Sequence, residues 1–145
     1  MAAVRVNSAL RLFWRIHRAI LKVSKGRLGQ RMGPGKQLLL TTVGRKSGEP
    51  RPVALTYLED GGRWIVVASY AGEDRDPTWW LNLAAHPGAE VTIGGRTVPV
   101  IAREVEDPER GPLYQRFVDD IDKSYGEYQA RTSRRIPVVA LQPEV

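Results

Sequence analysis

The feature that most constrains the fold of this chain is a series of short β-type segments separated only by turn sequences. Residues 38–43, 51–58 and 63–70 are rich in Leu, Val, Thr, Tyr and Trp, which favour strands. The sequences GRKSGEP and EDGG separate them, and both are typical of tight turns. Because such short connections join neighbouring antiparallel strands, the sequence predicts an antiparallel sheet and not a doubly wound parallel one.

Three further strands are expected in the second half of the chain, at residues 89–93, 96–105 and 136–141. A Gly-Gly pair between the first two of them is typical of a hairpin turn. Pro99 interrupts the second, and because proline cannot donate a backbone hydrogen bond, we expect a bulge or an edge position there. The chain is therefore expected to hold about six strands.

Two helical segments lie between these strands. The sequence DRDPTWWLNLAAHP predicts a short helix, with Asp76 as its N-cap and Pro77 at its first helical position. A second segment, DPERGPLYQRFVDDIDKSYGEYQA, carries three apolar residues on one helical face: Leu113, Phe117 and Ile121. Short strands with helices outside them indicate a mainly β protein built on a small antiparallel barrel.

We divide the chain into two parts, with the barrel domain at residues 37–145. Residues 1–36 comprise an amphipathic basic helix at 8–25 and a glycine-rich connector, GRLGQRMGPGK. At 100° per residue, the cations of this helix fall within an arc of about 80°. These cations are Arg11, Arg15, Arg18, Lys22 and Lys25. The helix either lies on an anionic membrane surface or packs against the barrel, and the sequence leaves both open.

The net charge of +6 is unevenly distributed. Residues 1–48 contain eleven Lys and Arg and no acidic residue. Such a concentration of positive charge indicates an anionic partner. The candidate classes are a phosphorylated small molecule, a phospholipid surface and a nucleic acid. No recognised nucleic-acid-binding module is present, which argues against nucleic acid. No apolar run reaches the roughly 18 residues of a spanning helix, so we expect a cytoplasmic protein, attached peripherally to the inner face of the cell membrane if the basic helix binds lipid.

Metal and thiol chemistry are disfavoured by composition. The chain has no cysteine, and its two histidines, His17 and His86, lie far apart in the sequence. The sequence therefore predicts no metal site and no cysteine nucleophile.

The turn between the first two strands, GRKSGEPR, combines glycine with cations. Its backbone N–H groups can converge on one point, and Arg45, Lys46, Ser47 and Arg51 surround that point with further donors. Such an arrangement can hold a phosphate. A merely solvated basic turn is the alternative, and the residues alone leave it open.

Three blocks of the sequence resemble the deazaflavin-dependent nitroreductase family. They are LLLTTVGRKSGEPR, then VVAS, then PTWWLNLAAHP, in the family's order, and the resemblance runs over about residues 28–142. It implies a split β-barrel that binds the deazaflavin coenzyme F420, which bears a phosphodiester and a polyglutamate tail. The reduced coenzyme would donate hydride to an electron-poor acceptor such as a menaquinone-like quinone or a nitro compound. A non-catalytic carrier of F420 or FMN is the alternative.

The resemblance also implies which residues contact the coenzyme. Arg45, Lys46, Ser47, Gly48 and Arg51 would hold the phosphate and tail carboxylates. The ring site would be lined by Pro52, Val53, Ala54, Val67, Ala68, Ser69, Tyr70, Thr78, Trp79, Trp80, Leu81 and Asn82. Because adjacent helical positions face different ways, we expect Trp79 in the pocket and Trp80 in the core.

On the substrate side, the resemblance implies tyrosines from the C-terminal helical segment. Tyr125 and Tyr128 are three residues apart and share a helical face, and with Ser69 they are the expected hydrogen-bond donors to the acceptor. Two positions differ from the aromatic residues of some relatives: Thr56 and Arg131. These departures leave nitro-compound reduction open, and the sequence does not give the oligomeric state.

Overall fold

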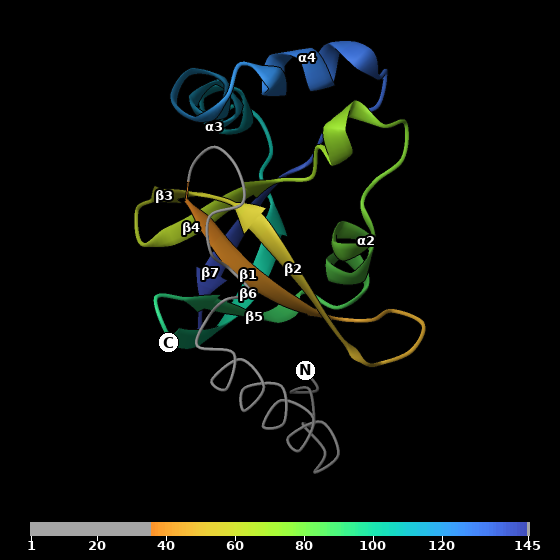
Figure 1. Cartoon of the computed structure of the whole chain (residues 1–145), viewed down its shortest axis with the longest axis vertical. Helices are drawn as coiled ribbons and strands as arrows, with labels where there is room; N and C mark the ends of the chain where they lie inside the picture. Colours follow the sequence, from red (N-terminus) through yellow and green to blue (C-terminus); the bar gives the residue numbers. More distant parts are fainter. Residues whose placement is uncertain (1–35, 145) are drawn as a thin grey trace.

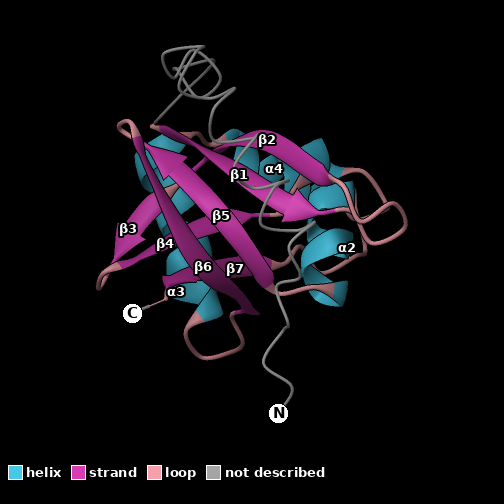
Figure 2. Cartoon of the chain, turned by 90° about the horizontal axis from the view of Figure 1, so that it is seen from below, coloured by secondary structure: helices cyan, strands magenta, loops and turns pink. Residues whose placement is uncertain are grey.

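The structure is a computed structural model that describes residues 36–144, and its centre is one seven-stranded antiparallel sheet (Figures 1 and 2). The strands are β1 (Gln37–Val43), β2 (Pro50–Thr56), β3 (Leu58–Asp60), β4 (Arg63–Val67), β5 (Gly88–Ile93), β6 (Arg96–Glu104) and β7 (Val138–Pro143). Their order in the sheet is β2-β1-β5-β6-β7-β4-β3. The predicted mainly β fold, a split β-barrel with helices outside, is confirmed.

Tyr57 explains both the curvature of the sheet and the strand count. It is the single residue between β2 and β3, which are the two edge strands. Because one residue of extended chain spans only about 3.3 Å, the two edges must lie close together and the sheet curls. The Tyr57 N–H also bonds the Lys36 carbonyl oxygen at 3.1 Å. The predicted strand 51–58 is therefore two strands, which gives seven where about six were expected.

Alternating side chains divide the apolar residues into two cores. Along β4, Trp64 and Val66 point into the barrel, whereas Ile65 and Val67 point outward to the helical layer. The outward side chains pack with Phe117, which is fully buried. Strands β4 and β7 are thus covered on both faces, and their sequences are almost continuously apolar for that reason.

The helices are α2 (Thr78–Ala85), α3 (Arg110–Arg116) and α4 (Ser124–Arg131), with a single 3₁₀ turn η1 (Tyr70–Gly72) and a π-helical turn η2 (Phe117–Ile121). The second helical segment of the sequence is thus broken into α3 and α4. Asp122 makes the break, because its backbone is extended and its carboxylate accepts the Ser124 N–H at 2.9 Å. Figure 1 shows α3 and α4 above the barrel and α2 beside it.

Three local predictions are resolved by tertiary contacts. The N-cap of α2 is Pro77 and not Asp76, whose carboxylate instead pairs with Arg134 at 2.9 Å. The third strand ends at Val67, before the predicted residue 70, because the chain turns away from the sheet there. Pro99 lies within an unbulged β5–β6 ladder, and β6 is an inner strand between β5 and β7, so the expected bulge or edge position is wrong. The proline is tolerated because it lies one residue beyond the last β6–β7 pair.

The predicted helix at 8–25 and residues 26–35 of the connector lie outside the described residues. Within residues 36–144, no helix combines the length and apolar character needed to cross a membrane.

Candidate functional site

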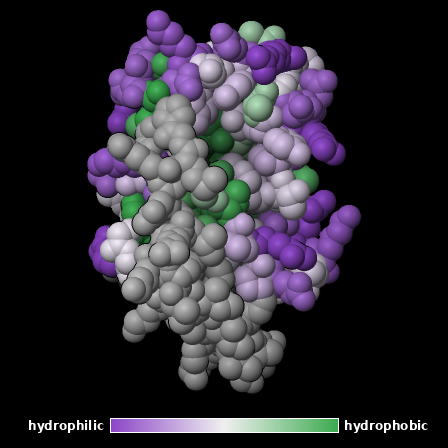
Figure 3. Space-filling view, viewed as in Figure 1, coloured by the Kyte–Doolittle hydropathy of each residue, from purple (hydrophilic) through white to green (hydrophobic). Residues whose placement is uncertain are grey.

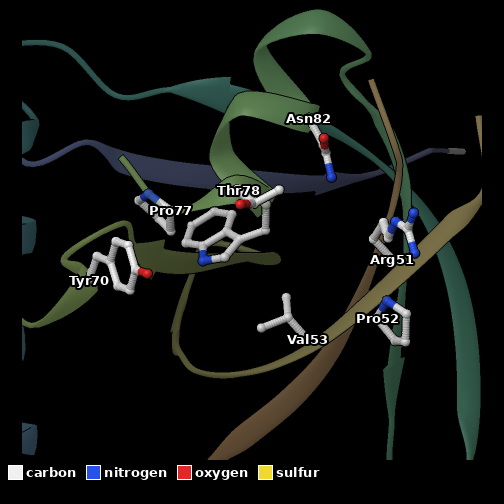
Figure 4. Close-up of a pocket in the computed structure, with 8 residues that line it drawn as sticks. Arg51, Pro52, Val53, Tyr70, Pro77, Thr78 and Asn82 are labelled. Atoms are coloured by element: carbon white, nitrogen blue, oxygen red, sulfur yellow. The ribbon is translucent and has the colours of Figure 1, made fainter. Parts of the chain in front are cut away.

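A cavity of about 320 Å³ opens between the start of β2, the η1 segment and α2 (Figure 4). These three stretches are distant in sequence, and the sheet brings them together. Figure 4 shows Tyr70 and Arg51 at opposite ends of the cavity. The lining residues are Arg51, Pro52, Val53, Tyr70, Pro77, Thr78, Trp79 and Asn82.

The β2 wall of the cavity is an edge of the sheet. Pro50 and Pro52 lie in this strand, and proline is tolerated there because an edge strand leaves one row of N–H groups unpaired. Val53 pairs with Leu40 of β1 and packs against the barrel core. The edge therefore offers the cavity an apolar wall. Prolines also discourage pairing with a strand of another molecule.

The cationic turn, residues 44–49, follows β1 at the same end of the barrel. It is closed by backbone hydrogen bonds from the Gly44 N–H to the Glu49 oxygen and from the Gly48 N–H to the Gly44 oxygen, both at 2.8 Å. Gly48 has a φ of 72°, which favours glycine. The Ser47 hydroxyl oxygen accepts from the Glu49 N–H at 3.1 Å and from Arg51 Nη2 at 3.2 Å. The serine thus orders the turn and steers Arg51.

Asn82 fastens this turn to the cavity. The residue is 1 % exposed, its Nδ2 donates to Thr42 Oγ1 at 3.0 Å, and its Oδ1 accepts the Arg45 N–H at 3.1 Å. One amide therefore joins α2, β1 and the turn. The side chains of Arg45 and Lys46 are exposed beside it. The result is a set of cations next to an apolar cavity.

The hydropathy of the molecular surface shows the same two parts, one apolar and one cationic. On the face shown in Figure 3, apolar side chains gather near β2 at the centre, and hydrophilic side chains lie over the β1–β2 turn to the lower right. Of the two tryptophans, Trp79 lines the cavity, as expected, yet it is also buried in the barrel core, whereas Trp80 is only partly buried against that core. The expected division into one pocket tryptophan and one core tryptophan is therefore only partly correct. The cavity can hold a flat apolar ring at one end and an anionic group at the other.

The tyrosines expected on the substrate side lie outside the cavity lining. The rings of Tyr125 and Tyr128 are 5.5 Å apart, edge to face, and both pack against the core beneath the helices. Burial raises the pKa of the Tyr125 phenol, and a side-chain hydrogen bond with Thr56 opposes that rise only in part. Its hydroxyl thus keeps its proton at neutral pH.

Comparison with known proteins places this architecture in a family. A family model described as F420H(2)-dependent quinone reductase matches residues 13–143. The chain belongs to the F420H(2)-dependent quinone reductase family. The F420H(2)-dependent quinone reductase of Mycobacterium tuberculosis is 42% identical over 130 residues, which cover 88% of this chain and 87% of that protein. The family match favours an enzyme over the non-catalytic carrier.

Two solved structures share the fold at similar identity. An F420-H2 dependent reductase has a TM-score of 0.66 at 37% identity and covers 73% of this chain and 93% of that chain. A structure described as a domain-swapped dimer has a TM-score of 0.69 at 32% identity and covers 91% of this chain and 99% of that chain.

The cavity fits the coenzyme of this quinone reductase family. F420 combines a flat fused ring with an acidic tail, and the site combines apolar walls from Val53 and Trp79 with the cationic turn. Its volume lies within the range of about 300–1,000 Å³ typical of small-molecule sites. No group of three or more His, Asp or Glu within the described part of the chain is arranged to hold a metal ion.

The structure brings together some of the predicted site residues and not others. Those that line the cavity are Arg51, Pro52, Val53, Tyr70, Thr78, Trp79 and Asn82. Those placed elsewhere are Arg45, Lys46, Ser47 and Gly48 on the adjacent turn, and Ala54, Val67, Ala68, Ser69, Trp80, Leu81, Tyr125 and Tyr128 outside the lining. Pro77 was assigned only a helix-starting role, yet it lines the cavity. Its place directly before Thr78 was the available signal.

Proposed function

We propose that the chain binds reduced F420 with its ring in the cavity and its acidic tail along the cationic turn, and reduces a quinone. One observation carries this assignment: Asn82 ties the turn to the helix that supplies Trp79, so the cationic and apolar parts of the site form one unit. When bound, reduced F420 supplies the hydride. The residues of the chain supply position and exclude water.

Positioning by the protein has two parts. Val53 and Trp79 offer apolar surface that keeps water from the ring, and Arg51 with the turn anchors the tail. Hydride transfer needs donor and acceptor carbons about 3–3.5 Å apart, and a ring fixed at both ends meets that need without a nucleophile or a metal. The chemistry therefore requires none of the groups that this sequence lacks.

Quinone reduction also needs a proton at the acceptor oxygen, because hydride alone leaves an oxyanion. Tyr125 and Tyr128 lie on α4, which packs against η1, and Tyr70 of η1 lines the cavity. We assign the two phenols, with Ser69, to the acceptor side as hydrogen-bond donors. Nitro compounds are a second acceptor class for the same site. Reduction of a nitroaromatic compound at a rate near that of menadione would support this wider range.

The test of coenzyme binding is neutralisation of the cations. Changing Arg45, Lys46 and Arg51 together to Gln should raise the dissociation constant of F420 by about 100-fold, since each exposed ion pair with the tail contributes about 1 kcal/mol. The control changes Arg96, Arg103 and Lys123 to Gln, which removes the same charge from exposed positions outside the cavity lining. An unchanged dissociation constant in the first variant would discard this site. A spectral shift without turnover of menadione would favour a carrier of F420 or FMN.

We further propose that residues 8–25 attach the protein to an anionic membrane surface, where a lipid-soluble quinone resides. The amphipathic sequence of this segment supports the proposal. Deleting residues 1–25 should abolish sedimentation with phosphatidylglycerol vesicles and spare reduction of a soluble quinone. Sedimentation equal to that of the full chain would refute it.

A further inference from the structure

The segment between β4 and α2 forms one wall of the cavity, and it belongs to no strand. Tyr70 and Pro77 of this segment line the cavity, while the strand itself ends at Val67. Such a wall cannot rely on a β-ladder for its shape. Something else must hold it in place.

The backbone of this wall is in an unfavourable conformation. Tyr70 and Ala71 have φ values of 44° and 53°, and Gly72 follows at 79°. Left-handed backbone is disfavoured for residues with a Cβ, because the Cβ approaches the following carbonyl oxygen. Two such residues in a row persist only where the surroundings fix them.

Arg134 provides that support from a distant point in the sequence. Its Nη1 donates to the Ala68 oxygen at 3.2 Å, its Nη2 to the Ser69 oxygen at 2.9 Å and its Nε to the Glu73 oxygen at 3.0 Å. These carbonyls flank the left-handed turn on both sides. Nη1 also pairs with the Asp76 carboxylate at 2.9 Å, one residue before Pro77. The side chain of Arg134 is only 12% exposed.

The wall is also joined to α4 by further contacts, and Figure 1 shows η1 beside that helix. Thr132 Oγ1 donates to Asp74 Oδ1 at 2.8 Å and also accepts the Arg134 N–H at 3.1 Å. Gly72 lies so close to α4 that a Cβ there would be 2.8 Å from the Tyr128 carbonyl oxygen. The coenzyme side and the tyrosine side of the site are therefore linked through one small region.

We propose that Arg134 is a positioning residue for the reaction, acting through the backbone of residues 68–76. It fixes Tyr70 and Pro77 against the coenzyme and sets the distance between that wall and α4. The inference rests on the proposed function for its consequence in catalysis, while the mechanical link is independent of it. Only a planar guanidinium can serve these acceptors together, because a Lys ammonium is a single point of charge.

The test compares Arg134→Lys, which keeps the charge, with Arg135→Lys, which alters the neighbouring exposed ion pair to Asp107. In the full chain without coenzyme, hydrogen–deuterium exchange of a peptide covering residues 68–77 should rise at least tenfold in Arg134→Lys. Exchange in β5 and β6 should stay as in the wild type. In Arg134→Lys, the dissociation constant of F420 should rise about tenfold. The fold-decrease in kcat for menadione should exceed the fold-change in its KM, because α4 is displaced as well. Arg135→Lys should match the wild type in all three measurements.

The outcomes separate the alternatives. Unchanged exchange at residues 68–77 in Arg134→Lys, or an equal rise in β5 and β6, would overturn the proposal, because Arg134 would then be dispensable or generally structural. If Arg134→Lys fails to fold, Asp76→Ala removes one of the acceptors and should raise exchange in the same peptide alone; no rise there would also overturn it. A wild-type chain that does not bind F420 would refute the proposed function, and the exchange data would still decide the role of Arg134.

Discussion

Replacing Asn82 with Ala tests whether a single buried amide holds the functional site together. The change removes the hydrogen bonds to Thr42 and to the Arg45 N–H, at 3.0 and 3.1 Å. Each is a neutral bond with a net contribution of about 1 kcal/mol, and the part-buried Arg45 N–H, once unpaired, costs up to a further ~1 kcal/mol. Thr42 keeps a long contact of 3.5 Å from its hydroxyl to the Arg51 carbonyl oxygen. We therefore expect a loss of roughly 2–3 kcal/mol in the free energy of unfolding.

For a domain of this size, such a loss lowers the melting temperature by about 10 °C. Circular dichroism at increasing temperature measures it. The released turn should also weaken F420 binding by about tenfold, because positioning of the cations has been lost. Ala84→Ser, on the exposed face of the same helix, is the control and should change neither quantity. A variant Asn82→Ala that melts within about 2 °C of the wild type, or that loses stability and keeps full F420 affinity, would refute the reasoning.

Three further predictions concern the helical layer. Burial raises the pKa of Tyr114 to about 12, so the folded state keeps a proton that the unfolded state loses near pH 10. The free energy of unfolding should therefore fall as the pH rises from 10 through 12. Urea unfolding should show a less steep fall for Tyr114→Phe. Gly72→Ala should destabilise the fold by about 1 kcal/mol or more beyond Gly62→Ala, because both have positive φ and only Gly72 contacts α4. Tyr128→Phe should lower kcat for menadione by about 100-fold with F420 affinity unchanged, and an equal loss of both would contradict its assignment.

Local patterns predicted most of the sheet. The turn sequences and alternating apolar residues located β1, β5, β6 and β7 within a few residues, because in an antiparallel sheet these signals are local. The division between β2 and β3 was not predicted. Nothing in the residues around Tyr57 distinguishes a strand that continues from one that crosses to the opposite edge. That distinction depends on closure of the whole barrel.

The candidate cavity could be anticipated where the family resemblance carried it. The resemblance assigns Arg51, Val53 and Trp79 to one site, and all three residues line the same cavity, while their role in coenzyme binding stays a prediction. The contacts of Arg134 were beyond such reasoning, because three of its acceptors are backbone carbonyls 61 to 66 positions away, and every residue has a carbonyl. Asp76 was misassigned because its partner is also distant in sequence. A carboxylate before a helix is a good N-cap unless it forms an ion pair elsewhere, as Asp76 does with Arg134.

The one-residue connection at Tyr57 also decides where this protein tolerates redesign. An added residue there would reverse which side chains of β3 face inward, since side chains alternate along a strand. Natural or engineered changes of chain length should therefore avoid that point. The exposed hairpin at Gly94 and Gly95, with open space around both, is the better place to graft a reporter peptide or an affinity tag.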